Sequence, residues 1–202
     1  VGLLYRQGYF RQRIDARGRQ QEYWVDTDPE RTPAVLVTGE DGAPLTVTVP
    51  VGGDDVVAQL WRVDVGRVPL YLLDTDRPEN DPARRWITAR LYVGDEETRL
   101  AQYTVLGVGG VRALHALGIT PSLLHLNEGH GALAALELAG PHASEEALAA
   151  ARKQVIFTTH TPVPAGNDTY PPDDVLAALE RWLPDTGLTS AALLALGRTD
   201  PD

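Results

Sequence analysis

The sequence predicts an α/β fold whose first half is rich in β-strands. In residues 1–92, apolar and β-branched runs are separated by clusters of Gly, Pro and Asp, which is typical of strands joined by turns. In residues 93–202, segments with apolar residues at helical spacing alternate with short apolar runs. Such alternation indicates βαβ units and a parallel sheet. We expect the two ranges to be parts of one domain.

The pattern of the first half marks strands, a hairpin turn and a loop. Residues 45–49, LTVTV, alternate apolar and polar side chains and predict a half-buried strand. Residues 39–42, GEDG, have the composition of a hairpin turn. Residues 76–85, DRPENDPARR, are polar and contain two prolines, so we expect a surface loop there.

The second half begins with a helix expected over residues 98–117. Gly107, Gly109 and Gly110 interrupt its apolar spacing, which would allow close packing or a kink. The remaining expected elements are a buried strand at 122–127, a strand at 153–159, and helices at 131–138, 144–152 and 173–182. Ser144 followed by two glutamates is typical of a helix start. Residues 183–202 are weakly patterned.

Composition excludes several classes of function. The net charge is −10, so no basic surface is available to meet nucleic acid or an anionic membrane. Cysteine is absent, which excludes disulfides and thiolate chemistry. No apolar run approaches the roughly 18 residues needed to span a bilayer. The 202 residues contain no methionine and one lysine, Lys153. Because the chain also starts abruptly, we expect an internal fragment of a longer protein.

The first candidate site follows the strand expected at 122–127 and contains His125, Asn127, Glu128 and His130. A strand end beside a helix N-terminus favours anionic or hydroxyl-rich ligands. The alternative is a helix cap, with Asn127 as the capping residue and Glu128 opposite the helix dipole. The residues alone leave both readings open. His125 and His130 are five positions apart, whereas two zinc ligands on one helix face are four apart, so a zinc site is less favoured.

The second candidate site is centred on His160, where the strand expected at 153–159 ends. Pro162, Pro164 and Gly166 follow it, and prolines stiffen a loop by limiting its conformations. The alternative is a structural turn with His160 hydrogen-bonded in the core. In a parallel sheet this strand end and the one at Asn127 would lie side by side at one sheet edge, which favours a ligand site.

A third polar segment contains Asp95, Glu96, Glu97 and Arg99, which we expect in a loop leading into the helix at 98–117. A solvated turn with capping acids is favoured over a binding role on the residues alone. The glycines at 107–110 do not fit G-x-G-x-x-G and do not follow a strand. They therefore indicate helix packing and not a phosphate-binding loop.

Five segments, in order, resemble the α-glucan (glycogen) phosphorylase family in its shorter bacterial and archaeal branch. They are LLYRQGYFRQRID, LWRVDVGRVPLYLLDTD, ITARLYVGDEETRLAQ, HLNEGH and FTTHTPVPAGND. The resemblance covers about residues 1–182. It implies that the chain is part of the N-terminal Rossmann-like domain of a two-domain, glycosyltransferase B-type fold.

The resemblance also implies an activity for the parent protein. Enzymes of this family release glucose 1-phosphate from glycogen, starch or maltodextrin with inorganic phosphate, and use pyridoxal 5′-phosphate. We therefore expect a cytoplasmic, homo-oligomeric parent enzyme with no nucleic-acid or membrane partner. The family's cofactor lysine lies outside this chain, and Lys153 does not match it. The chain alone is expected to be inactive.

By the family pattern, His160 is the catalytic-site residue that borders the glucosyl group. The residues implied in glucan binding are Asn127, Glu128 and His130 on the acceptor side of the cleft, and Asp95 and Arg99 in a mobile gating loop. The chain also departs from the family: Tyr103 stands where a glutamate often follows the glutamine, Asn167 replaces a histidine, and Gly131 and Leu133 replace an Ala-Ala-Phe pattern.

Two alternatives to a phosphorylase remain at this point. A metal-dependent hydrolase would use His125, Glu128, His130 and His160, with three or four ligands around zinc or manganese. A non-catalytic carbohydrate-binding or regulatory protein would retain the half-domain without the chemistry.

Overall fold

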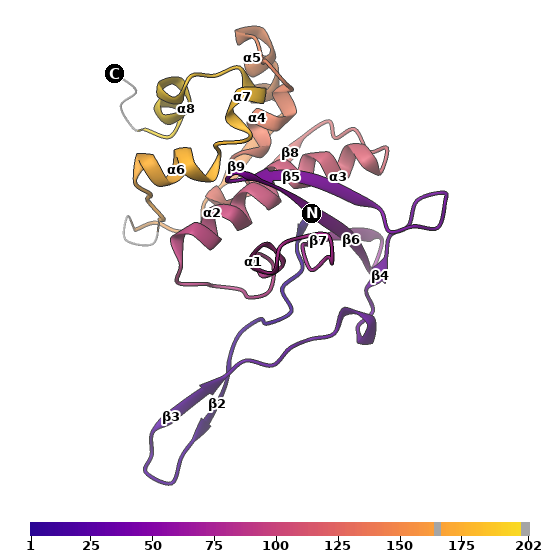
Figure 1. The fold of residues 1–202 in the computed structure, drawn as a ribbon, viewed down its shortest axis with the longest axis vertical. Helices are drawn as coiled ribbons and strands as arrows, with labels where there is room; N and C mark the ends of the chain where they lie inside the picture. Colours follow the sequence, from indigo (N-terminus) through magenta and orange to yellow (C-terminus); the bar gives the residue numbers. More distant parts are fainter. Residues whose placement is uncertain (164–166, 199–202) are drawn as a thin grey trace.

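A computed structural model describes residues 1–163 and 167–198, and its fold belongs to the predicted α/β class (Figure 1). The strands are β1 (Gly2–Leu3), β2 (Arg11–Ile14), β3 (Gln20–Tyr23), β4 (Val35–Leu36), β5 (Thr46–Val51), β6 (Asp54–Val65), β7 (Val68–Asp74), β8 (Leu124–Asn127) and β9 (Val155–Thr158). The α-helices are α1 (Pro82–Arg85), α2 (Glu96–Thr104), α3 (Gly110–Ala116), α4 (Ala134–Ala139), α5 (Glu145–Lys153), α6 (Pro172–Ala178), α7 (Leu183–Thr186) and α8 (Ser190–Leu196). Short 3-10 helices are η1 (Pro29–Arg31) and η3 (Gly129–Gly131), and η2 (Val105–Gly109) is a π-helical segment. Pro164 and Gly166 of the predicted loop lie outside the described residues.

The first half forms a five-stranded sheet centred on the long strand β6. The strand β6 pairs antiparallel with β4, β5 and β7, and β1 pairs parallel with β7. The prediction of a half-buried strand at residues 45–49 is confirmed, because Val47 and Val49 are buried while Thr46 and Thr48 are exposed. The turn predicted at residues 39–42 is also present, closed by the N–H of Gly39 donating to the carbonyl of Ala43 at 2.8 Å.

One continuous helical stretch, formed by α2, η2 and α3, packs against the apolar face of this sheet. Val105 and Val108 of η2 are fully buried in the same core as Val49 and Leu73 of the sheet. The predicted close packing of the glycines is confirmed. A Cβ on Gly107 would lie 2.9 Å from the Cβ of Leu133, and a Cβ on Gly109 would lie 2.9 Å from Cγ2 of Val49. The glycines therefore let the helix approach both the sheet and α4.

The second half places β8 and β9 side by side as a two-stranded parallel sheet, with η3, α4 and α5 on the chain between them. The predicted start of α5 is confirmed, since the Ser144 hydroxyl accepts from the N–H of Ala147 at 3.2 Å. The expectation of a buried strand at 122–127 is wrong. Its residues are half-buried or exposed, and Phe157 of β9 is 58% exposed, because no other strand pairs with these two within the described part of the chain.

Two further expectations about local structure, the loop at 76–85 and the full length of the helix at 173–182, are wrong in part. The predicted loop at 76–85 ends in the short helix α1, where the Asp81 carboxylate caps the N–H of Ala83 at 2.9 Å and Pro82 occupies the first turn. The weakly patterned tail contains α7 and α8, and the Thr189 hydroxyl caps α8. The helix expected at 173–182 is shorter than predicted and ends at Ala178. The cap and proline signals for α1 were present but stood in polar surroundings.

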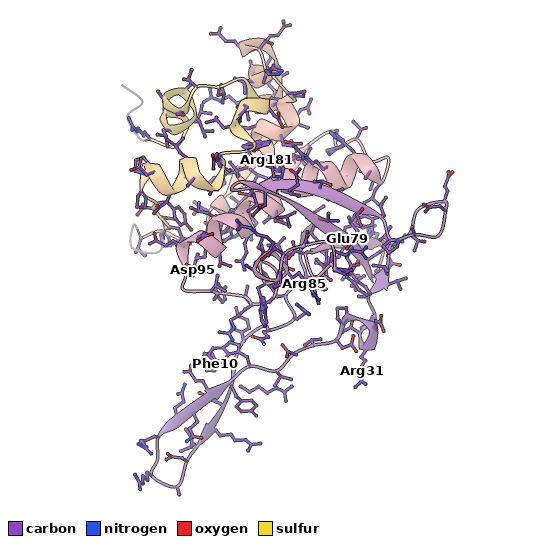
Figure 2. All side chains as sticks on the ribbon, viewed as in Figure 1. Phe10, Arg31, Glu79, Arg85, Asp95 and Arg181 are labelled. Atoms are coloured by element: carbon purple, nitrogen blue, oxygen red, sulfur yellow. The ribbon has the colours of Figure 1, made fainter. Side chains whose placement is uncertain are left out.

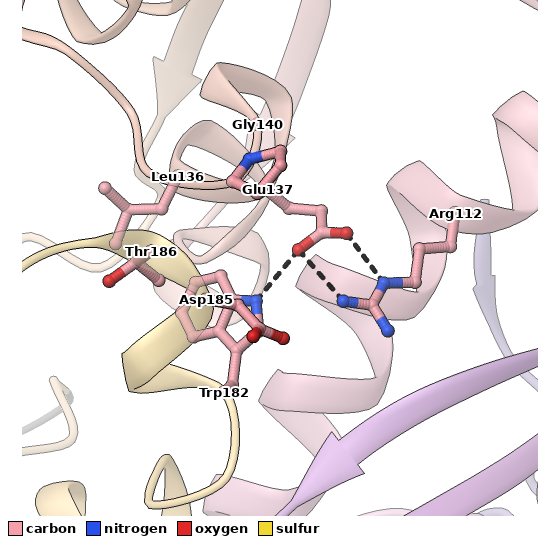
Figure 3. Close-up of a pocket in the computed structure, with 8 residues that line it drawn as sticks. Arg112, Leu136, Glu137, Gly140, Trp182, Asp185 and Thr186 are labelled. Carbon is pink, nitrogen blue, oxygen red and sulfur yellow. Dashed lines mark hydrogen bonds and ion pairs between the residues drawn. The ribbon is translucent and has the colours of Figure 1, made fainter.

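A polar brace connects α3, α4 and the segment that leads into α7 (Figure 3). Glu137 of α4 accepts from Nε of Arg112 at 2.6 Å and from Nε1 of the buried Trp182 at 2.9 Å. Arg112 also donates to the carbonyl of Thr48 in β5 at 2.7 Å. These partly buried groups satisfy one another, so the brace ties the helices of the second half to the sheet of the first.

The strands β2 and β3 form a hairpin arm that projects away from the rest of the fold (Figure 1). All eight of its strand residues are exposed. Figure 2 labels Phe10 at the base of the arm, where its ring lies 6.0 Å from that of Trp24. The base is fixed to the body by Arg90, whose guanidinium stacks 4.3 Å from the Trp24 ring. The strand residues of the arm, which lie beyond this anchored base, are therefore not buried.

Within residues 1–163 and 167–198, no helix combines the length and apolar character needed to cross a membrane.

Gly107→Ala is expected to destabilise the protein, whereas Gly110→Ala in the same helical stretch is not. The new methyl at 107 would meet backbone of α4 at 3.0 Å, while at 110 it would make an ordinary 3.6 Å contact with Val1. Overpacking of this kind lowers the free energy of unfolding by about 1–3 kcal/mol. Alanine in an open helical position raises it by up to about 1 kcal/mol. Urea unfolding of both variants measures the difference, and equal effects at the two positions would contradict the packing account.

Candidate functional site

The parallel pairing of β8 with β9 brings the two predicted polar strand ends together. Asn127 lies opposite Thr158 in the register, and the N–H of Glu128 donates to the carbonyl of Thr158 at 2.8 Å. The expectation that these strand ends lie side by side is therefore confirmed. We call Asn127, Glu128 and residues 158–161 the strand-end cluster.

The carboxylate of Glu128 organises the strand-end cluster by accepting hydrogen bonds from three consecutive residues. Oε1 accepts from the backbone N–H of His160 and from the hydroxyl of Thr161 at 3.2 Å. Oε2 accepts from the hydroxyl of Thr159 at 3.1 Å. Both carboxylate oxygens thus bind the segment that carries His160. The geometry gives Glu128 the role of a clamp on this segment, not of a helix cap, since its side chain does not cap η3.

The backbone of Glu128 is held in a conformation that non-glycine residues rarely adopt. Its φ is 62° and its ψ is −176°. This region belongs almost entirely to glycine, and a residue held there costs about 1–3 kcal/mol. Such a conformation persists only where surrounding contacts determine it. Here the turn aims the Glu128 carboxylate at residues 159–161, which supply the compensating hydrogen bonds.

The hydrogen bonds to Glu128 stabilise its ionised form. The N–H of His160 has the largest effect, followed by the hydroxyls of Thr159 and Thr161, and together they hold the pKa of Glu128 below its ordinary value. A carboxylate with a lowered pKa contributes its stabilisation above its ordinary pKa. The contribution is lost as the pH falls through the lowered value. The clamp is therefore fully formed at neutral pH and is released only by acid.

His160 and Asn127 present complementary hydrogen-bonding groups at the surface. Nε2 of His160 donates to Oδ1 of Asn127 at 2.9 Å, and both residues are exposed. In a neutral imidazole this leaves Nδ1 as a hydrogen-bond acceptor. The Asn127 amide NH₂ remains a donor. Paired donors and acceptors without net charge suit the hydroxyl groups of a neutral, hydroxyl-rich ligand.

A second group of polar side chains, centred on Tyr103, contains two of the other predicted site residues. Arg99 donates to the Tyr103 hydroxyl at 2.8 Å and also pairs with Asp168. The Tyr103 hydroxyl donates to Asp168 at 2.5 Å. The ring of Tyr103 lies 5.0 Å from that of His130. Arg99 and His130, predicted from separate motifs, are thus linked through Tyr103.

Asp95 caps the first turn of α2. Its Oδ2 accepts from the N–H of Thr98 at 2.9 Å and from the Thr98 hydroxyl, and these bonds, the hydroxyl first, lower the pKa of Asp95. The expectation that Glu96, Glu97 and Arg99 lie in a loop is wrong, because α2 begins at Glu96. The capping carboxylate starts the helix earlier than the apolar pattern indicated.

The described residues give no support to the metal-hydrolase alternative. Nowhere in residues 1–163 and 167–198 do three His, Cys, Asp or Glu side chains come close enough to hold a metal ion. Nε2 of His125 instead lies 2.6 Å from the hydroxyl of Thr158. The histidines near the strand ends are therefore engaged with hydroxyl, amide and aromatic groups.

A cavity of about 150 Å³ lies beside the brace formed by Arg112, Glu137 and Trp182 (Figure 3). None of the residues that line it belongs to the strand-end cluster. Arg112, Glu137 and Trp182 in its wall already bond one another, and we assign no ligand to it. The one lysine, Lys153, is exposed at the end of α5, beside the start of β9, and so lies at the opposite end of this strand from His160.

The sequence pattern did not reveal the roles of three residues at the site. Thr159 and Thr161 stood in the predicted motif, but their role as donors to a carboxylate more than 30 positions away has no local signal. Tyr103 was noted only as a departure from a family pattern. Its spacing of four residues from Arg99 on a helix was a usable signal, because side chains at this spacing face each other.

Comparisons with known proteins show that most or nearly all of the chain is similar to named glucan phosphorylases. It is 45% identical to a maltodextrin phosphorylase of Thermococcus litoralis, over 98% of this chain and 24% of that protein. It is 40% identical to a glycogen phosphorylase of Mycobacterium tuberculosis, over 99% of this chain and 25% of that protein. A glycogen phosphorylase of Aquifex aeolicus is 39% identical over 85% of the chain. The chain spans about a quarter of the length of these relatives. No protein-family profile matches it.

Glu128→Gln is expected to loosen the segment around His160 without unfolding the protein. The amide NH₂ of glutamine can accept nothing, so bonds to one side-chain oxygen are lost, and the remaining oxygen is uncharged. Hydrogen–deuterium exchange at the amides of residues 160 and 161 should become faster at neutral pH. Wild-type exchange should show the same change only in acid, once Glu128 is protonated. Glu180→Gln, which removes an exposed carboxylate outside the cluster, serves as the control. Unchanged protection at residue 160 in Glu128→Gln would contradict the clamp.

Proposed function

We propose that this chain, which belongs to the α-glucan phosphorylase family, forms part of the glucan-binding half of an enzyme that cleaves α-1,4-glucans with inorganic phosphate. The product of that reaction is glucose 1-phosphate. The proposal is supported by the maltodextrin and glycogen phosphorylases to which 85–99% of the chain is similar at 39–45% identity. The parent protein, and not these 202 residues alone, would carry the activity.

The observation that carries the proposal is the strand-end cluster. Its chemistry suits a neutral sugar: an imidazole acceptor on His160, an amide donor on Asn127, and no metal-binding group among the described residues. We assign His160 to the glucosyl group undergoing transfer, and Asn127 and His130 to the acceptor glucan. Positioned hydrogen bonds of this kind favour the transition state when they are held rigidly before the substrate arrives.

We assign Glu128, Asp95 and Arg99 to the same side of the cleft with more specific roles than the family pattern implied. Glu128 would act on the glucan through the segment that it clamps, since both of its oxygens are engaged there. Asp95 would fix the start of α2, and Arg99 would hold Asp168. These three residues would thus shape the site around the groups that touch sugar.

We further propose that residues 1–92 and 93–202 together form part of a Rossmann-like domain of the glycosyltransferase B type. The two ranges share one hydrophobic core, in which β5 and β7 pack against η2. Parallel strands are normally covered on both faces. The exposure of Ile156 and Phe157 on β9 is therefore consistent with further strands or helices of the parent covering this pair.

The residues of this chain do not fit pyridoxal 5′-phosphate, which such an enzyme would require. Lys153 is the one lysine available, and it lies beyond the far end of β9 from His160, a strand that alone spans roughly 13 Å. We therefore assign the cofactor to a part of the parent outside these residues. We also propose, from the family, a cytoplasmic homo-oligomer.

The proposed activity predicts release of glucose 1-phosphate from maltoheptaose and phosphate by the full-length parent protein supplied with cofactor. His160→Ala should lower kcat by about 100-fold or more, because it removes a preorganised group beside the reacting sugar. His115→Ala, on an exposed position of α3, is the matched control and should leave the rate unchanged.

No release by a folded, cofactor-loaded parent would refute the phosphorylase assignment. If that protein still bound maltoheptaose, a non-catalytic carbohydrate-binding role would replace it.

A further inference from the structure

Tyr103 contacts Arg99 in its own helix and two parts of the chain that are distant in sequence. Its hydroxyl, on α2, donates to Asp168 at 2.5 Å and accepts from Arg99 at 2.8 Å. Its ring lies 5.0 Å from His130 of η3 and 6.3 Å, edge-on, from Tyr170. Tyr103 thereby joins α2 to η3 and to the segment that contains Asp168 and Tyr170.

The hydroxyl and the ring of Tyr103 make separate contacts. Burial first, and then the hydrogen bond to Asp168, raise the pKa of Tyr103 above its ordinary value, so the phenol keeps its proton and remains a donor. Partial burial opposes ionisation of Asp168, but the Tyr103 hydroxyl and the Arg99 charge hold its pKa below the ordinary value. The hydroxyl therefore holds residue 168, while the ring supports His130.

Tyr103 is half-buried and contacts two segments of the candidate site, one at His130 and one at Asp168. His130 is exposed on η3, directly after the Glu128 turn. Asp168 and Tyr170 come later in the chain than residues 159–161, which Glu128 binds. Glu128 thus binds residues 159–161, and Tyr103 binds Asp168 further along the chain.

We propose that Tyr103 is a positioning residue for the acceptor glucan: it holds His130 and residues 168–170 in register with the strand-end cluster. This inference rests on the proposed function for the identity of the ligand, but not for the positioning itself. The helix α2 supplies a rigid support, since Ala101, Gln102 and Thr104 around Tyr103 are buried. A small shift of the Tyr103 side chain would therefore move His130 or Asp168, while the helix α2 stays in place.

Two substitutions separate the hydroxyl from the ring. Tyr103→Phe keeps the ring against His130 and removes the donor to Asp168. Tyr103→Leu removes both contacts. Tyr23→Phe, on the projecting arm, deletes a phenol hydroxyl far from the site and is the matched control.

The first measurement is hydrogen–deuterium exchange of the full-length, cofactor-loaded protein. Tyr103→Phe should speed exchange at the amides of residues 168–170 by about three- to ten-fold, the range expected for loss of one hydrogen bond. The thermal midpoint should stay close to that of the wild type. Tyr23→Phe should change neither quantity. Unchanged exchange at residues 168–170 in Tyr103→Phe would overturn the positioning role, whether or not the protein is a phosphorylase.

The second measurement is steady-state kinetics with maltoheptaose and phosphate. Tyr103→Phe should raise the KM for maltoheptaose by about three- to ten-fold, and Tyr103→Leu should raise it further, with the KM for phosphate unchanged in both. A purely structural role would instead lower the active fraction and reduce kcat at constant KM, which would overturn the inference. If the wild type releases no glucose 1-phosphate, the proposed function fails, and the exchange result alone decides the role of Tyr103.

Discussion

The parallel register of β8 against β9 is the constraint on which the candidate site depends. Because Asn127 lies opposite Thr158, the next residue on each strand emerges at the same edge, and Glu128 meets residues 159–161. A shift by one residue would turn every side chain of the strand to the other face. The carboxylate of Glu128 then converts strand pairing into a defined loop. Its unfavourable φ of 62° is acceptable only because three donors converge on it.

The sheet of the first half fixes this arrangement from a distance, through close helix packing. Gly109 lets η2 reach Val49 of the sheet, and Gly107 lets the same turn reach Leu133 at the start of α4. The segment η3, which carries His130, immediately precedes that contact. The Glu137 brace ties the other end of α4 to β5 through Arg112. The core of the first half therefore sets the position of polar groups that belong to the second.

Sequence patterns predicted the features that depend on neighbouring residues. Ser144 marked a helix start, and alternation at residues 45–49 marked a half-buried strand, because capping and period-two burial are local. The strand ends at Asn127 and Thr158 could be placed at one sheet edge from the sequence, because the strands of a βαβ unit run parallel. The clamp role of Glu128 could not be read this way, since its donors lie 31–33 positions away. The projecting arm was also not predicted: residues 11–23 bury nothing, so they carry no hydrophobic period.

A crystal structure of the parent protein with a bound maltooligosaccharide tests the central claim most directly. The account predicts sugar hydroxyls within hydrogen-bond distance of the His160 and Asn127 side chains, with the Glu128 carboxylate still bound to the N–H of His160 and to the hydroxyls of Thr159 and Thr161. A sugar bonded directly to both oxygens of Glu128, with the His160 segment released from that carboxylate, would contradict it.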